Sequence, residues 1–252
     1  MAATEEICSY LPDVLWECIF KFLSCDNHTL KSYSVFSKQF LSITNCLRFS
    51  VKITDETISF LPRLFHRFPN LTSLELTILS KTVEEVDDIL ALISTFPLDI
   101  KSLNLSKDFY SKKCIQIPIN GLIPLSKTMK NLKSLTFHGM SYFNKKNVFL
   151  IAEYFPLLKN LNLTYPRVRS SRDFFINHND PLLALPNLRE IDLSGNHISD
   201  QFIDFLYHSC KLLHKIVIID RISRKPGEFG IQGKYYSSDI VIIYWENYTE
   251  LH

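Results

Sequence analysis

The sequence lacks the features that mark several classes of protein. It has no run of about 18 consecutive apolar residues, the length that a membrane-spanning helix needs. Its first ten residues are acidic and contain no apolar stretch of the kind that a secretory signal requires. Lysine and arginine number 28 against 26 acidic residues, so a net charge of +2 gives no field that draws the chain to nucleic acid or to an anionic membrane. We therefore expect a cytoplasmic or nuclear protein that binds neither nucleic acid nor membrane.

Motifs of metal centres and of catalysis are also missing. The six cysteines are irregularly spaced and include no C-x-x-C pair, which indicates reduced thiols rather than metal ligands. Cys18 and Cys210 stand among apolar residues and are predicted to be small core residues. The sequence has no H-E-x-x-H, G-x-S-x-G, P-loop or G-x-G-x-x-G motif. These absences predict a non-catalytic protein without metal or cofactor.

The sequence does contain an internal repeat of the form L-x-x-L-x-L. Its six copies begin at Leu71, Ile100, Leu132, Leu158, Leu188 and Leu213. The spacings are 29, 32, 26, 30 and 25 residues and average 28.4, which lies within the range of leucine-rich repeats. Each copy predicts a short strand whose fourth and sixth positions point inward, while the residues between them face outward. Stacked copies predict a curved parallel sheet with a concave face of small polar residues that offers hydrogen bonds at most.

The segments between the copies are predicted to return as helices. Apolar residues between Val86 and Ile93, and again between Phe202 and Tyr207, recur at helical spacing. Each return closes on an apolar residue just before the next strand, such as Phe68, Phe155 or Cys210. Residues 220–252 break the pattern, and the apolar run at 240–245 predicts a strand in an atypical cap or a truncated repeat.

The first 46 residues form a different unit. Apolar residues at helical spacing predict a first helix with the stripe Val14, Leu15, Cys18, Ile19, Phe22 and Leu23. Two further short helices are predicted, one through Leu30 and Tyr33 and one through Phe36, Phe40 and Ile43. So small a unit has little core of its own, so we expect it to be buried against a partner or against the repeats.

Residues 11–44 resemble an F-box, whose pattern begins with Leu-Pro, continues with Ile-Phe and ends with Val-x-(Lys/Arg)-x-(Trp/Phe). Together with the repeats, the chain resembles plant F-box/leucine-rich-repeat proteins, the substrate receptors of SCF ubiquitin ligases. The resemblance implies that the helices bind a Skp-type adaptor, and through it cullin and RING subunits, while the repeats hold a target protein. The adaptor-binding residues that it implies are Leu11, Pro12, Leu15, Ile19, Phe20, Leu30, Val35, Lys38 and Phe40.

The expected fold class is α/β, in three parts. A three-helix F-box at 1–46 precedes a short right-handed leucine-rich-repeat solenoid at 47–219, with a curved parallel sheet inside and helices outside. The atypical segment 220–252 follows. Two alternatives to a ligase receptor stay open: a leucine-rich interaction protein whose F-box does not recruit the adaptor, and a truncated competitor that binds the adaptor but has too few repeats to hold a target.

Basic and aromatic residues follow three successive predicted strands, in the segments 107–113, 141–146 and 165–172. We expect them to stack along one rim, called the basic rim below, that begins with Lys107 and receives an acidic or phosphorylated target segment. The alternative is a solvated loop edge. The candidate target-binding residues are Lys112, Lys113, Tyr142, Lys145, Lys146, Tyr165, Arg167 and Arg169.

Overall fold

The computed structural model describes residues 11–23, 27–77, 81–107, 116–140, 145–164, 185–194, 196, 200–220 and 241–246. Three helices come first: α2 (Asp13–Leu23), α3 (Asn27–Tyr33) and α4 (Lys38–Cys46). The strands are β1 (Ser50–Thr54), β2 (Ser73–Thr77), β3 (Ser102–Ser106), β4 (Ser134–His138), β5 (Asn160–Asn162), β6 (Glu190–Asp192), β7 (Lys215–Asp220) and β8 (Val241–Glu246). The later helices are η1 (Ile58–Phe60), α5 (Leu61–Arg67), α6 (Val83–Ser94), α7 (Ile119–Thr128), α8 (Lys145–Tyr154) and α9 (Asp200–Ser209).

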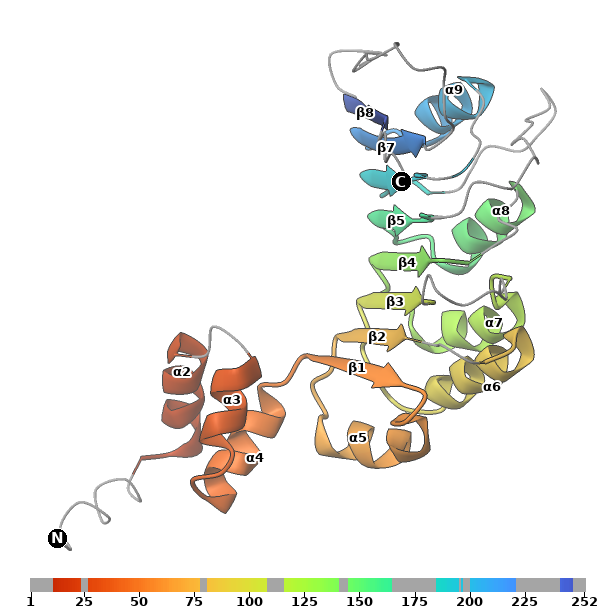
Figure 1. The fold of residues 1–252 in the computed structure, drawn as a ribbon. Coiled ribbons are helices and arrows are strands. Elements are labelled where there is room, and N and C mark those ends of the chain that lie inside the picture. The colour runs from red at the N-terminus through yellow and green to blue at the C-terminus, as the bar shows by residue number, and fades with distance from the viewer. Residues whose placement is uncertain are drawn as a thin grey trace, which may run out of the picture.

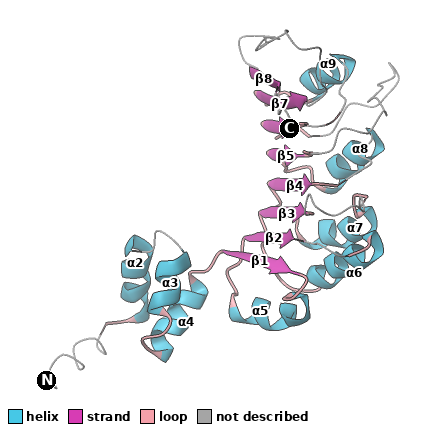
Figure 2. Ribbon diagram, in the orientation of Figure 1, coloured by secondary structure: helices cyan, strands magenta, loops and turns pink. Residues whose placement is uncertain are grey.

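The strands form one parallel sheet in chain order, which confirms the α/β class and the predicted parallel sheet. Neighbouring strands pair so that the fourth positions of the six copies align, from Leu74 beside Leu103 to Ile191 beside Ile216. The side chains at these positions are buried, and so are those at the sixth positions. Figure 2 shows the strands as one column and helices α6 to α9 as a second column beside it. Each copy thus buries its apolar residues against its neighbours and against the helices.

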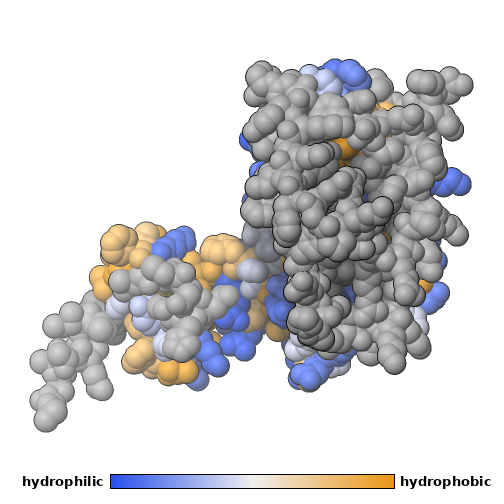
Figure 3. Space-filling view, turned by 45° about the horizontal axis from the view of Figure 1, so that its top comes forward, coloured by the Kyte–Doolittle hydropathy of each residue, from blue (hydrophilic) through white to orange (hydrophobic). Residues whose placement is uncertain are grey.

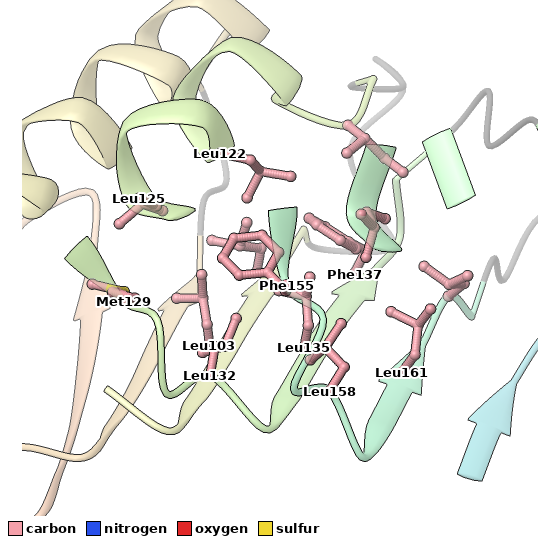
Figure 4. Close-up of a cluster of buried hydrophobic side chains, with 14 of the residues drawn as sticks. Leu103, Leu122, Leu125, Met129, Leu132, Leu135, Phe137, Phe155, Leu158 and Leu161 are labelled. Carbon is pink, nitrogen blue, oxygen red and sulfur yellow. The ribbon is translucent and has the colours of Figure 1, made fainter. Parts of the chain in front are cut away.

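The core lies between the sheet and the column of helices. In the close-up of Figure 4, Leu103, Leu135 and Leu161 point from successive strands towards the same layer of buried side chains as Leu122 of α7. The predicted turn residues Phe68, Phe155 and Cys210 are buried there too, with 6%, 2% and 1% of their surface exposed. Continuous burial of this kind is what holds a stack of short parallel strands together, because no single strand covers its own apolar face.

The returning segments are helical where the spacing predicted helices. Thr82 caps α6 by accepting a hydrogen bond from the backbone N–H of Glu85, and the Glu85 carboxylate accepts one from the backbone N–H of Thr82. Helix α7 approaches α6 closely at Gly121, whose N–H donates to Asp87 Oδ1 at 2.7 Å. A Cβ atom on Gly121 would lie 2.8 Å from the Asp87 Cα atom, so the absence of a side chain permits this contact.

The sheet has two strands that the six copies do not include, β1 and β8. By register, the first position of the repeat falls on Arg48 before β1, where the other copies have leucine or isoleucine. Strand β8 pairs with β7 from Val241 onwards, so the run predicted as a strand does lie in register with the repeats. The expectation that residues 220–252 break the repeat pattern was therefore wrong for the run at 241–246.

The three helices α2, α3 and α4 lie beside β1 and have a core of their own (Figure 1). That core consists of Phe20, Leu30, Ile43 and Leu47, and it is separate from the core of the sheet. None of the helices in the described ranges is long and apolar enough to cross a membrane.

Candidate functional site

Aromatic rings fix the arrangement of the helical unit formed by α2, α3 and α4. Phe20 of α2 stacks on Tyr33 of α3 with ring centroids 4.7 Å apart, and it meets Phe40 of α4 edge to face at 4.9 Å. Trp16 packs on Phe40 at 4.7 Å. Aromatic pairs of this geometry add to the free energy of area burial, so the inner side of α2 is defined by Trp16 and Phe20.

The outer side of α2 carries an apolar stripe, made of Val14, Leu15, Cys18 and Phe22. Cys18 and Phe22 follow Val14 by four and eight positions and follow Leu15 by three and seven, so the four residues share one side of the helix. The exposed fractions of Val14, Leu15 and Phe22 are 67%, 47% and 87%, and Cys18 is exposed as well. The prediction of Cys18 as a core residue was wrong, because the larger Trp16 and Phe20 occupy the inner side instead. The periodicity thus located an exposed apolar side of the helix rather than its core side.

The turn between α3 and α4 exposes two more large apolar side chains. Val35 is 79% exposed and Phe36 is 72% exposed. Ser37 follows them and caps α4 by accepting a hydrogen bond from the Phe40 N–H at 3.1 Å. The capped helix start therefore fixes the backbone of this turn. In Figure 3 hydrophobic surface, shown in orange, lies over the helical unit among polar atoms.

The nine residues that the resemblance implies for adaptor binding fall into three groups. Four are exposed, namely Pro12, Leu15, Val35 and Lys38, and three are half-buried, namely Leu11, Ile19 and Phe40. Phe20 and Leu30 are only 2% and 8% exposed, so in this conformation they support the helices from within and do not form the surface. Val14, Phe22 and Phe36 were missing from the implied set although they are among the most exposed apolar residues.

The second candidate surface is the polar face of the sheet, on the side away from the core. A groove of about 310 Å³ runs across β4 to β7. The Glu190 carboxylate lies 3.4 Å from Lys215 Nζ, and Asp192 accepts hydrogen bonds from the Ser194 N–H at 2.9 Å and from Asn162 Nδ2 at 3.4 Å. The register places these side chains in adjacent rows. The groove therefore offers fixed carboxylates and amides for hydrogen bonds.

His138 ends β4 on the same face. Burial lowers the pKa of its imidazole, and the nearby Asp192 carboxylate opposes that shift without cancelling it. The ring is therefore neutral at pH 7, and it adds a hydrogen-bonding group rather than a charge to this face.

No protein-family model matches the chain. Its function must therefore be inferred from the two surfaces themselves.

The basic rim lies almost wholly outside the described residues. That holds for Lys112, Lys113, Tyr142, Tyr165, Arg167 and Arg169. Lys145 begins α8 and the next residue, Lys146, is exposed. Lys107 is 4% exposed, so its prediction as the first residue of an exposed basic rim was wrong; it directly follows β3, and its backbone N–H donates to the His138 carbonyl.

The described cysteines show no sign of a redox or metal site. Cys18, Cys46 and Cys210 are free thiols, and no group of three potential metal ligands occurs within the described ranges. Burial raises the pKa of the Cys210 thiol to about 12, so this predicted core cysteine is protonated at neutral pH.

Proposed function

We propose that the chain is the substrate-recognition subunit of an SCF-type ubiquitin ligase. Its helical unit is an F-box that binds a Skp-type adaptor, and through it cullin and RING subunits. Its sheet and returning helices are a right-handed leucine-rich-repeat solenoid that binds a target protein. The subunit itself is not catalytic, since the transfer of ubiquitin takes place on the other subunits.

The observation that carries the proposal is the exposed apolar surface of the helical unit. Five large apolar side chains there are at least 47% exposed: Val14, Leu15, Phe22, Val35 and Phe36. Small soluble units seldom display such a concentration unless a partner covers it. Burial of apolar surface contributes about 25 cal/mol per Å², so a partner that covers these side chains gains a substantial free energy.

The separation of the two cores supports the proposal that the helical unit and the sheet bind different partners. The core of the helical unit buries Phe20 and Ile43 and contains no residue from the sheet. An adaptor can therefore cover the outer side of α2 while the polar groove across β4 to β7 stays open to a target. A receptor needs both surfaces to be free at once.

Calorimetric titration of the full chain with a plant Skp-type adaptor tests the proposal. We expect binding at micromolar Kd or tighter. The double variant Leu15→Ser/Val35→Ser removes two exposed apolar side chains without entering the core, and it should bind at least about tenfold more weakly, equivalent to about 1.4 kcal/mol. Leu157→Ser is the matched control, because Leu157 is 41% exposed against 47% for Leu15 but lies on the sheet part of the molecule.

The alternatives make different predictions. A folded chain that does not bind the adaptor, or a control variant as weak as the double variant, would contradict the proposal and favour a non-ligase interaction protein. Adaptor binding in cells without any ubiquitylated target would favour the competitor.

A further inference from the structure

A second cavity lies where the helical unit meets the sheet. Its volume is about 320 Å³, and its walls come from α3, from the end of α4 and from the end of α5. Three of the residues that line it are basic, namely Lys31, Arg48 and Arg67. None of its lining residues is acidic. The cavity is therefore a concentration of positive charge in a chain whose net charge is only +2.

The two arginines share one aromatic ring. The guanidinium carbon of Arg48 lies 5.3 Å from the centre of the Phe68 ring, and that of Arg67 lies 5.2 Å from the same centre. Contact with an aromatic face stabilises each cation, so the Phe68 ring supports both arginines at the cavity. Within the part of the chain that the structure describes, neither guanidinium forms an ion pair with a carboxylate.

One hydrogen bond sets the orientation of Arg67. Its Nε–H donates to Asn45 Oδ1 at 3.2 Å, which ties the end of α5 to α4. An arginine has five N–H donors in a fixed planar fork, so the four on the Nη atoms are not used by this bond. The ring of Phe68 supports the fork from one side. The arrangement presents oriented donors and positive charge to whatever enters the cavity.

We propose that this cavity binds a phosphate monoester. Arginine forks match the oxygens of phosphate in pairs, and the charge of a dianion complements the three cations that line the cavity. The volume lies at the lower end of the roughly 300–1,000 Å³ of small-molecule sites, so there is room for the phosphate and for part of the group that carries it. The inference does not depend on the function proposed above.

Bound phosphate links the two units of the molecule. Lys31 and Arg48 belong to the helical unit or to the segment that leaves it, whereas Arg67 ends α5 beside the sheet. An anion held by all three cations therefore restrains the helical unit relative to the sheet.

Calorimetric titration of the full chain tests the site with inorganic phosphate, with O-phosphoserine and, as a blank, with serine. We expect saturable one-to-one binding of a phosphate-bearing probe and none of serine. Arg48→Gln should weaken binding at least about tenfold, which is the scale of one charge-assisted hydrogen bond. Tighter binding of O-phosphoserine would identify a phosphorylated organic group as the ligand, and equal binding would identify free phosphate.

Arg63→Gln is the matched control, because Arg63 is an exposed residue of α5 that does not line the cavity. It removes the same charge and should leave the affinity unchanged. If Arg48→Gln does not fold, Lys31→Gln serves instead, since Lys31 is exposed at the cavity edge. The proposal is overturned if neither probe binds saturably at millimolar concentration, or if Arg63→Gln weakens binding as much as the cavity variants.

Discussion

Truncation of two phenylalanines on α2 should have very different effects on the stability of the helical unit. Phe20 is 2% exposed and contacts three other rings, whereas Phe22, two residues later, is 87% exposed. Removing a buried phenylalanine costs about 3–5 kcal/mol, because apolar contacts are lost and a cavity is left. A substitution at an exposed site usually changes stability by less than about 0.5 kcal/mol. Phe20→Ala should therefore destabilise the helical unit severely, and Phe22→Ser should leave its stability unchanged.

Urea unfolding followed by tryptophan fluorescence measures this difference. The chain has two tryptophans, and a Trp245→Phe background leaves Trp16, whose ring centroid lies 5.7 Å from that of Phe20. If Phe20→Ala abolishes folding of the unit, Ile43→Val gives a milder loss of about 0.5–1.5 kcal/mol at another buried position. A loss above about 1 kcal/mol in Phe22→Ser would refute the assignment of the outer side of α2 and, with it, the surface on which the proposed function depends.

Two further predictions follow from the titrating groups. Hydrogen bonds from the Thr82 backbone N–H and from Lys81 lower the pKa of Glu85 below its usual 4.5. As the pH falls, the Glu85 carboxylate is therefore protonated in the unfolded chain before it is protonated in the folded chain. The resulting stabilisation is present above about pH 4.5 and is lost as the pH falls through the folded-state pKa of Glu85. When the urea midpoint is measured against pH, Glu85→Gln should reduce the dependence of the midpoint on pH below about 4.5. An unchanged pH dependence would contradict the capping role. Because burial raises the pKa of Cys210 to about 12, iodoacetamide at about pH 8 should alkylate this thiol only after urea unfolding, as read by peptide mass spectrometry, and labelling at equal rates in the native protein would disprove its burial.

The strand ladder was predictable because its signal is local and repeated. Leucine or isoleucine at positions one, four and six recurs often enough to locate β2 to β7 and their inward residues. Strand β1 was not predicted, and β8 was predicted as a strand outside the repeat pattern. A strand at the end of a sheet has a neighbouring strand on one edge only, so it tolerates a weaker match to the repeat. Arg48 takes the first position before β1, where the six copies have leucine or isoleucine. Register, a property of the assembled sheet, reveals both end strands.

The side of α2 that faces inward was not predictable from spacing alone. Both sides of this helix are apolar: the outer stripe consists of Val14, Leu15, Cys18 and Phe22, and the inner side carries Trp16 and Phe20. Aromatic packing determines which side of α2 faces inward, because Phe20 packs against Tyr33 of α3 and Phe40 of α4. The aromatic residues of all three predicted helices were the available signal.

Neither the sheet groove nor the junction cavity follows from a motif. Glu190 and Lys215, which meet in the groove, are 25 residues apart, and Asn45 is 22 residues from its partner Arg67. Sequence analysis did predict that the residues between the inward positions would be polar and outward-facing. The local spacing of Lys31, Arg48 and Arg67 does not predict that the three cations line one cavity, because they come from α3, from the segment after α4 and from the end of α5.

The junction between the helical unit and the sheet is weaker than either core. An anion bound at this junction therefore has a strong effect on how the two parts are held together. Side-chain hydrogen bonds across it include those from Arg67 to Asn45 and from Asn70 to the Cys46 carbonyl, both at exposed positions. Each such bond contributes only about 0.5–1.5 kcal/mol, whereas each core excludes water from many apolar side chains. An anion that bridges Lys31 and Arg48 to Arg67 would therefore change the balance at the junction more than the same charge elsewhere, and would set how rigidly the outer side of α2 is held relative to the sheet groove.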